Sequence, residues 1–334
     1  MDLVDKYISY VRDERRYSER TVSIYADVLH RFFASSMSDE HQSGSELSDQ
    51  AIIEELTVQR IRSYEVGLMD NLKLNPSTVR LHLSVLSGFC RFLIKREYLK
   101  SNPVTLVQKP KLSRRLPVFY KKEAMDTYME QTDIYEDQRH LDTFLSSPDS
   151  ESGKKDYEKR LARLVVSMLY GLGLRRAELI SLNIEDVDFG RNVVKVRGKG
   201  DKMREIPIIG TICEEILLYL KAVEVLVACE RSLKEPLLLT YTGRRLYPGY
   251  VDKVVKNELS SVSGITGRKS PHVLRHTLAT QLLDNEADLN SIKELLGHSS
   301  LAATQVYTHN SVAKLKSIYK SAHPRAKNGG KHGD

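Results

Sequence analysis

A basic segment with spaced prolines divides the chain and limits how it can fold. Residues 101–123 read SNPVTLVQKPKLSRRLPVFYKKE, with three prolines and no apolar periodicity. Proline lacks a backbone donor and resists helix, so we expect this stretch to be extended and solvated. With 334 residues, of which 41% are hydrophobic, the chain is long enough for two separate cores. The sequence therefore predicts a domain over residues 1–108, a linker over 109–117 and a second domain over 118–334.

The cations of this segment need either water or an anion. The formal net charge of the chain is +7 and its pI is near 9.1, which favours an anionic partner and nucleic acid first. A solvated connector that touches nothing is the alternative. The candidate DNA contacts here are Lys109, Lys111, Arg114 and Arg115.

Before the linker, apolar residues recur at helical spacing. In SERTVSIYADVLHRFFASS, Ser18 is a plausible N-cap, and Val22, Val28 and Phe32 fall on one stripe. Pro76 begins another helix, and further helices are expected near 2–14 and 57–68. This part is predicted to be a small all-helical domain.

The second domain has a mixed pattern. A polar stretch near 133–157 contains SSPDSESGKK and is predicted to be a flexible loop or insertion. Helices follow over 157–172 and from about Arg175, and NVVKVRGKGDKMREIPI then has two β-branched runs around glycines, typical of a hairpin. Helical spacing returns from Gly249. The expected fold class is therefore mainly α with a small antiparallel β-sheet.

Several function classes are not supported by the sequence. Cys90, Cys213 and Cys229 are widely spaced and form no CxxC pair, as expected of reduced core residues in a cytoplasmic protein. No apolar run approaches eighteen residues, so neither a membrane span nor a signal peptide is expected. Nucleotide-binding glycine loops, zinc-ligand spacing and a GxSxG elbow are also missing from the sequence.

An anion site is suggested by SPHVLRHTLATQLL. With Ser270 as the cap and Pro271 in the first turn, His272 and Arg275 lie one turn apart near a helix N-terminus, which attracts anions. A structural or surface role is the competing interpretation, because this spacing is common.

A second basic candidate lies in GLGLRRAELISL. Arg175 or Arg176 follows a glycine-broken helix end, and the carboxylate of Glu178 could hold a guanidinium fork against a phosphate. A solvated Arg–Glu pair is the alternative.

The expected hairpin tip, RGKGDKMR, carries Lys199, Lys202 and Arg204. Basic residues at a tip usually serve solubility, but they can also project into a DNA groove.

The segment LNSIKELLGHSSLAATQVYTH contains the remaining candidates. Asn290 is expected to cap a helix that ends at Gly297, His298 to lie in the following turn, and Tyr307 to lie in or near a further helix. Tyr307 is either a packing aromatic or a reagent.

The order of these motifs resembles the catalytic set of the tyrosine recombinases. HVLRHTLAT and LGHSSLAATQVYTH are similar to the two most diagnostic boxes of that family, and the resemblance covers nearly the whole chain. It implies a two-domain, C-shaped DNA clamp with a SAM-like helical core-binding domain and a mixed α/β catalytic domain. The ending YTHNSVAKLKSIYKSAHPRAK resembles the Xer branch.

The resemblance also implies the chemistry. Tyr307 would form a 3′-phosphotyrosine link without metal, ATP or other cofactor, and Glu178 would support the site rather than react. The implied catalytic residues are Arg175 and Arg275 as the phosphate clamp, His272 as the base, Lys199 as the acid, His298 as a phosphate donor and Tyr307 as the nucleophile.

The implied partners are a double-stranded DNA recombination site and further protomers. The active form would be a homotetramer, or a heterotetramer with a paralogous recombinase, and a helix near 311–322 would dock on the neighbouring protomer. A DNA translocase is a candidate activator, and no membrane is involved. The expected role is dimer resolution of chromosomes or plasmids; the alternatives are an integrase or excisionase of a mobile element and a non-catalytic architectural DNA-binding protein.

Overall fold

The computed structural model describes residues 1–35, 48–112, 118–132, 150–198, 202–227 and 230–297. The chain divides into two compact units, Met1–Arg115 and Leu116–Asp334. In the described ranges no helix has the length and apolarity needed to cross a membrane. Outside those ranges lie the predictions for Arg114, Arg115, Lys199, Cys229, His298, Tyr307 and the helix near 311–322.

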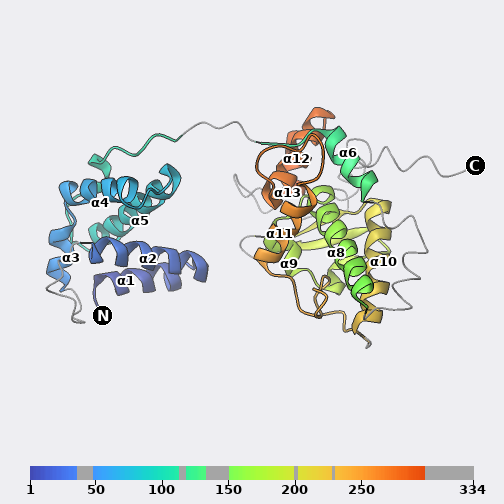
Figure 1. The fold of residues 1–334 in the computed structure, drawn as a ribbon. Helices are drawn as coiled ribbons and strands as arrows, with labels where there is room; N and C mark the ends of the chain where they lie inside the picture. Colours follow the sequence, from blue (N-terminus) through green and yellow to red (C-terminus); the bar gives the residue numbers. More distant parts are fainter. Residues whose placement is uncertain (36–47, 113–117, 133–149, 199–201, 228–229, 298–334) are drawn as a thin grey trace, which may run out of the picture. The chain divides into compact units, whose positions relative to one another are not determined.

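The first unit is helical throughout its described part (Figure 1). Ser18 accepts a hydrogen bond from the Thr21 backbone N–H at 3.3 Å, which confirms the predicted N-cap. Its elements are α1 Leu3–Ser9, a π-helical turn η1 Tyr10–Glu14, α2 Glu19–Ala34, α3 Asp49–Glu55, α4 Val58–Asp70, α5 Pro76–Lys95 and a 3₁₀ turn η3 Pro103–Leu106.

One apolar core holds this unit together. Leu29 and Phe32 of α2 pack with Leu83 and Phe89 of α5, and all four side chains are fully buried. The helix α3 was missed from the sequence because it is only seven residues long, and it buries a single isoleucine, Ile52. The stripe on α2 and the Pro76 start of α5 are confirmed.

The second unit is built around α8 Glu151–Gly171, whose residues from Leu161 onward are buried. It packs against α10 Gly210–Val227, α11 Pro248–Glu258 and α12 Pro271–Asp284, and Figure 1 shows α8 between α10 and α11. Around it lie α6 Lys122–Gln131, α9 Arg176–Ser181, a 3₁₀ turn η4 Ile184–Asp186 and α13 Leu289–Leu296.

The predicted polar insertion is wrong at its C-terminal end. Residues 151–157 form the first turns of α8, because Ser150 caps the helix by accepting from the Gly153 N–H at 2.9 Å and Tyr157 is fully buried. The serine cap was the signal in the sequence. The part of the stretch from 133 to 149 lies outside the described residues.

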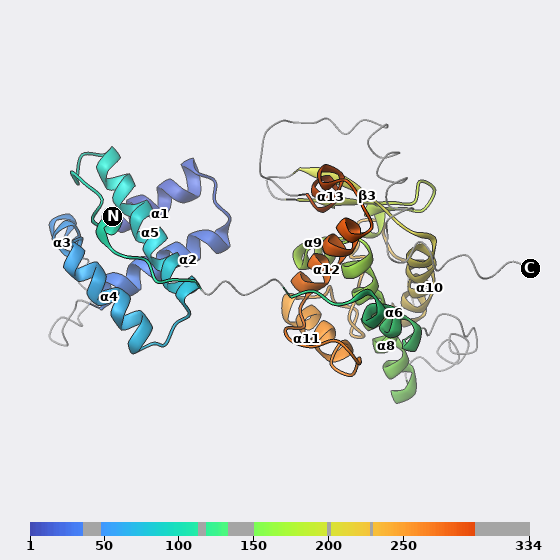
Figure 2. The same cartoon turned by 90° about the horizontal axis from the view of Figure 1, so that it is seen from above.

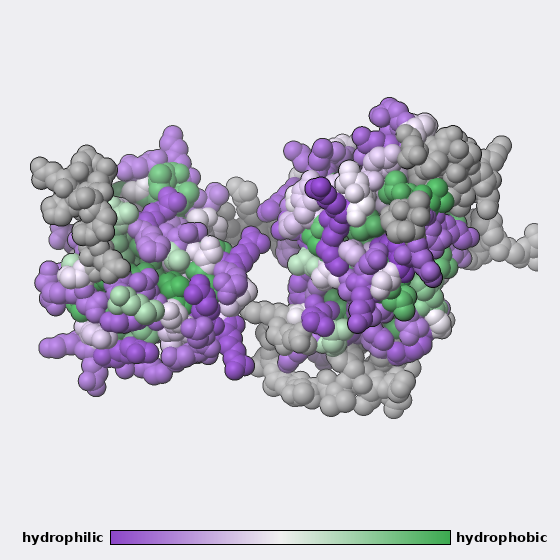
Figure 3. Space-filling view, turned by 90° about the horizontal axis from the view of Figure 1, so that it is seen from below, coloured by the Kyte–Doolittle hydropathy of each residue, from purple (hydrophilic) through white to green (hydrophobic). Residues whose placement is uncertain are grey.

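A three-stranded antiparallel sheet completes this unit, as predicted. Its order is β1 Val187–Asp188, β2 Val193–Arg197 and β3 Met203–Pro207. The register places Val194 opposite Ile206 and Val196 opposite Arg204. Figure 2 shows α13 beside β3, against which it packs. The view in Figure 3 shows a mainly hydrophilic face on the described part of each unit, with small scattered apolar patches.

Candidate active site

Arg175 is placed by the start of α9. It is the N-cap residue in an extended conformation, and Glu178, three residues on, accepts from its backbone N–H at 2.8 Å. The same carboxylate accepts from the Arg175 guanidinium at 2.6 Å. The neighbouring Arg176 instead pairs with Asp252 of α11. The sequence left open whether Arg175 or Arg176 pairs with Glu178, and in the structure it is Arg175.

Gly173 lets the chain turn tightly from α8 toward Arg175. Its φ is +60°, and a Cβ there would meet Leu296 at 2.7 Å and Leu278 at 2.9 Å. Glycine adopts this left-handed conformation without the cost that other residues have. The backbone carbonyl of Gly173 accepts a hydrogen bond from Arg275.

Arg275 lies on α12, and 6% of the residue is exposed. Its guanidinium donates to the carbonyls of Gly173 and Leu296 and lies 4.0 Å from the Glu178 carboxylate. Burial, and then the positive charge of Arg175, lower the pKa of Arg275 to about 10. The side chain therefore still carries its charge at neutral pH.

Arg204 corrects a prediction. We expected it to reach DNA from the hairpin tip, but it lies on β3, is 5% exposed, and donates from both terminal nitrogens to Glu178 at 2.9 and 2.8 Å. Side chains alternate along a strand, so Arg204 shares a face with Ile206. This period-two pattern was the signal by which the sequence could have placed Arg204 inside.

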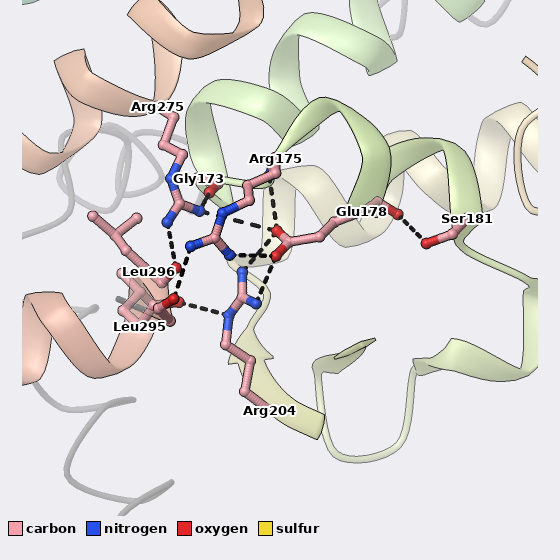
Figure 4. Close-up of polar contacts among 9 residues, drawn as sticks. Gly173, Arg175, Glu178, Ser181, Arg204, Arg275, Leu295 and Leu296 are labelled. Carbon is pink, nitrogen blue, oxygen red and sulfur yellow. Dashed lines mark hydrogen bonds and ion pairs between the residues drawn. The ribbon is translucent and has the colours of Figure 1, made fainter. Parts of the chain in front are cut away.

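Three guanidiniums thus surround one buried carboxylate (Figure 4). Burial raises the pKa of Glu178, but the charges and hydrogen bonds of Arg204 and Arg175 outweigh it and hold that pKa below its usual value. With Arg275 included, three positive charges and one negative charge leave this cluster with two net positive charges. Fixed cations arranged in this way can stabilise an anion without reorganising.

The same arginines also fasten the end of α13. The carbonyls of Leu295, Leu296 and Gly297 accept from Arg204, Arg275 and Arg175 respectively. The last carbonyls of a helix lack intrahelical partners and carry partial negative charge, so cations are favourable there. Gly297 ends the helix with φ +62°, as predicted, and the cap at its start is Asp288 rather than Asn290.

The remaining candidates are at the surface where they are described. His272 is exposed in the first turn of α12, and Lys109, Lys111 and Lys202 are exposed. Ser270 is the N-cap residue of α12, but its side chain makes no capping hydrogen bond. Among the described residues, no group of three His, Cys, Asp or Glu side chains could hold a metal ion.

Comparisons with known proteins identify the family of this chain. Residues 133–314 match the model described as "Phage integrase family", and residues 4–97 match "Phage integrase, N-terminal SAM-like domain". The matched range includes Arg175, Glu178, Arg275 and Tyr307. The chain is 34% identical over 333 residues to the tyrosine recombinase XerC of Chlorobaculum tepidum, and the alignment covers 96% of this chain and 94% of that protein.

Solved structures share the fold at lower identity. The recombinase XerH bound to its palindromic difH substrate matches with a TM-score of 0.62 at 19% identity, covering 95% of this chain and 83% of that one. The Tn1549 transposon integrase bound to transposon right-end DNA also gives a TM-score of 0.62, at 17% identity, covering 95% and 99%. With a family match over more than half its length and close XerC relatives, the chain belongs to the phage integrase family, the tyrosine recombinases.

Proposed function

We propose that this chain is a Xer-type site-specific recombinase, which cuts and rejoins DNA through a 3′-phosphotyrosine intermediate. The observation that carries the proposal is the cluster of Arg175, Arg204 and Arg275 around Glu178, which carries two net positive charges. A phosphodiester gains negative charge in its transition state, and such a cluster stabilises that charge without reorganising.

Arg175 and Arg275 act as the clamp on the nonbridging oxygens. The hydrogen bonds among the described residues use two of the five N–H groups of Arg275, on Gly173 and Leu296. The Arg175 side chain is 40% exposed and so is open to a ligand at one side. Loss of one such donor commonly slows catalysis by about 10²–10³-fold.

Tyr307 supplies the nucleophile. Its phenol oxygen attacks the scissile phosphorus while His272 takes the phenol proton, because a phenol with a pKa of about 10 is a poor nucleophile at neutral pH. The bond from phosphorus to the 5′ oxygen breaks, and Lys199 protonates that oxygen. His298 donates to the phosphate. A 5′-hydroxyl of the partner strand then reverses these steps, so the strands are rejoined without ATP.

The proposed role is resolution of chromosome or plasmid dimers, as the XerC names of its relatives suggest. The working assembly is a tetramer on two recombination sites, either of this chain alone or with a paralogous recombinase, and a DNA translocase is the proposed activator. The relatives include proteins named XerC and XerD, which makes a paralogous partner reasonable.

Covalent capture tests the activity and the role together. Wild-type protein is expressed in its host, denatured and purified, and the attached DNA is sequenced, with Tyr307→Phe as the matched control. We expect an adduct at one chromosomal site from the wild type and none from the variant, although the variant still binds that site in a band-shift assay. An adduct that persists in the variant would contradict the assignment of Tyr307, and recovery of the ends of a mobile element would identify an integrase instead.

A further inference from the structure

We propose that Arg204 is a positioning residue of the recombination site, which acts through Glu178 on the phosphate clamp at Arg175. The inference rests on the proposed function and deepens it. It concerns a side chain that the sequence had assigned to the DNA surface, but that the structure places behind the clamp.

The hydrogen bonds show how Arg204 fixes the carboxylate. One Glu178 oxygen accepts from Arg175 at 2.6 Å and from Arg204 at 2.9 Å, and the other accepts from the Arg175 backbone N–H and from Arg204, both at 2.8 Å. The two-pronged contact from Arg204 determines the plane of the carboxylate, as planar guanidinium–carboxylate pairs do. The direction in which Glu178 holds Arg175 therefore depends on Arg204.

A second contact anchors Arg204 itself. Its Nε donates to the Leu295 carbonyl at 3.0 Å, which joins β3 to the end of α13. A Cβ on Gly297 would lie 3.1–3.2 Å from the Arg204 side chain, so the glycine leaves just enough room for it. The guanidinium of Arg204 is thus held by two partners, the Glu178 carboxylate and the end of α13.

The side chain of Arg204 points inward, to Glu178 and Leu295. Arg204 is 5% exposed, and all three of its side-chain nitrogens already donate within the protein. Arg175, in contrast, has a 40% exposed side chain. Arg204 would therefore influence catalysis by orienting the exposed arginine, and the influence would appear only when the phosphate carries the charge that Arg175 must meet.

A substrate lacking that charge provides the test. The duplex recovered by covalent capture is synthesised with its normal scissile phosphate, or with a methyl group replacing one nonbridging oxygen, which makes the linkage neutral. Rates of adduct formation are compared for the wild type, Arg204→Gln, Arg204→Lys and Arg175→Ala in the full chain. Arg191→Gln is the matched control. Arg191 also forms a two-pronged pair with a carboxylate, that of Glu205, which neighbours Arg204 on β3, but this pair is at an exposed site.

We expect Arg204→Gln to form the adduct about 10–100-fold more slowly on the normal duplex, since displacing a catalytic group by about 1 Å can reduce the rate that much. On the neutral duplex the defect should shrink at least tenfold relative to wild type, as it should for Arg175→Ala. Arg204→Lys keeps the buried charge but loses the fork, so it should fold and show a smaller defect of the same kind. Half-site binding and the control should stay within about twofold of wild type.

Equal slowing of the Arg204 variants on both duplexes would overturn the inference, because a general folding defect does not depend on phosphate charge. Wild-type rates in both variants would also overturn it. If Arg204→Gln fails to fold, Arg204→Lys decides the question alone. If the wild type itself forms no adduct, the proposed function fails, and the inference fails with it.

Discussion

Replacing Glu178 with glutamine should strongly destabilise the catalytic unit. The change removes the negative charge between two close cations while leaving the shape of the side chain almost unchanged. The Coulomb attraction between two opposite unit charges 4 Å apart is about 4 kcal/mol at an effective dielectric constant of about 20. Part of this is offset because the carboxylate no longer has to be desolvated, and removing one partner of a buried pair typically costs about 3–5 kcal/mol. We expect a loss of that size in the free energy of unfolding.

Urea unfolding followed by circular dichroism measures this loss in the full chain, which has no tryptophan to report by fluorescence. Glu205→Gln is the control: it breaks the pair with Arg191, whose side chains are 22% and 42% exposed, and should cost about 0.2–1 kcal/mol. If Glu178→Gln destabilises the chain no more than Glu205→Gln does, the carboxylate does not hold the arginines together and the reasoning is refuted.

The stability difference between wild type and Glu178→Gln should depend on pH in a definite direction. The pKa of Glu178 is held below its usual value, so its stabilisation is present above the unfolded-state pKa and is lost as the pH falls through the folded-state pKa. The difference in stability between wild type and Glu178→Gln should therefore be largest near neutral pH and shrink below about pH 4. A difference that grows on acidification would contradict this.

Three further changes have distinct expected outcomes. Gly173→Ala should lower the free energy of unfolding by about 2–4 kcal/mol, since φ is +60° and the new Cβ would overlap Leu296 and Leu278. Gly243→Ala is the control: its φ is +73° but the space around it is open, so it should lower that free energy by only about 1–2 kcal/mol. Equal losses in urea unfolding would contradict the steric argument. Lys199→Ala should slow cleavage far less when the leaving 5′ oxygen is replaced by sulfur, which needs no proton. Equal slowing of adduct formation on both substrates would point to Lys202 as the acid or to a binding role for Lys199. Deleting residues 311–334 should weaken synapsis before half-site binding in band-shift assays, and a parallel loss of both would exclude a docking role.

Local patterns predicted most of the fold. The stripe on α2, the proline start of α5 and the hairpin of β2 and β3 each depend on residues close together in the sequence, so spacing and turn chemistry are sufficient. The prediction for the start of α8 was wrong because its first turns are polar. A serine cap and the burial of Tyr157 in a core formed by residues far along the sequence make these turns helical.

The structure brings together Arg175, Glu178 and Arg275, which the sequence named as candidates, but the contacts between them could not be predicted. The arginines were found by their order along the chain, which the family resemblance interprets. Their contacts join residues 173, 204 and 295–297, which no local pattern relates. Arg204 shows the limit clearly, because charge alone suggested a surface role, whereas its alternation with Ile206 and its buried partner Glu178 put it inside.

The arginine bonds to the end of α13 have a consequence for how this protein can change over evolution. The donors that hold the helix terminus in place belong to the same side chains that would receive a phosphate. A mutation that removes one of these arginines would therefore reduce both abundance in the cell and rate of recombination, so the two properties would change together at these positions. By the same linkage, an anion that binds to the cluster would raise the melting temperature of the catalytic unit.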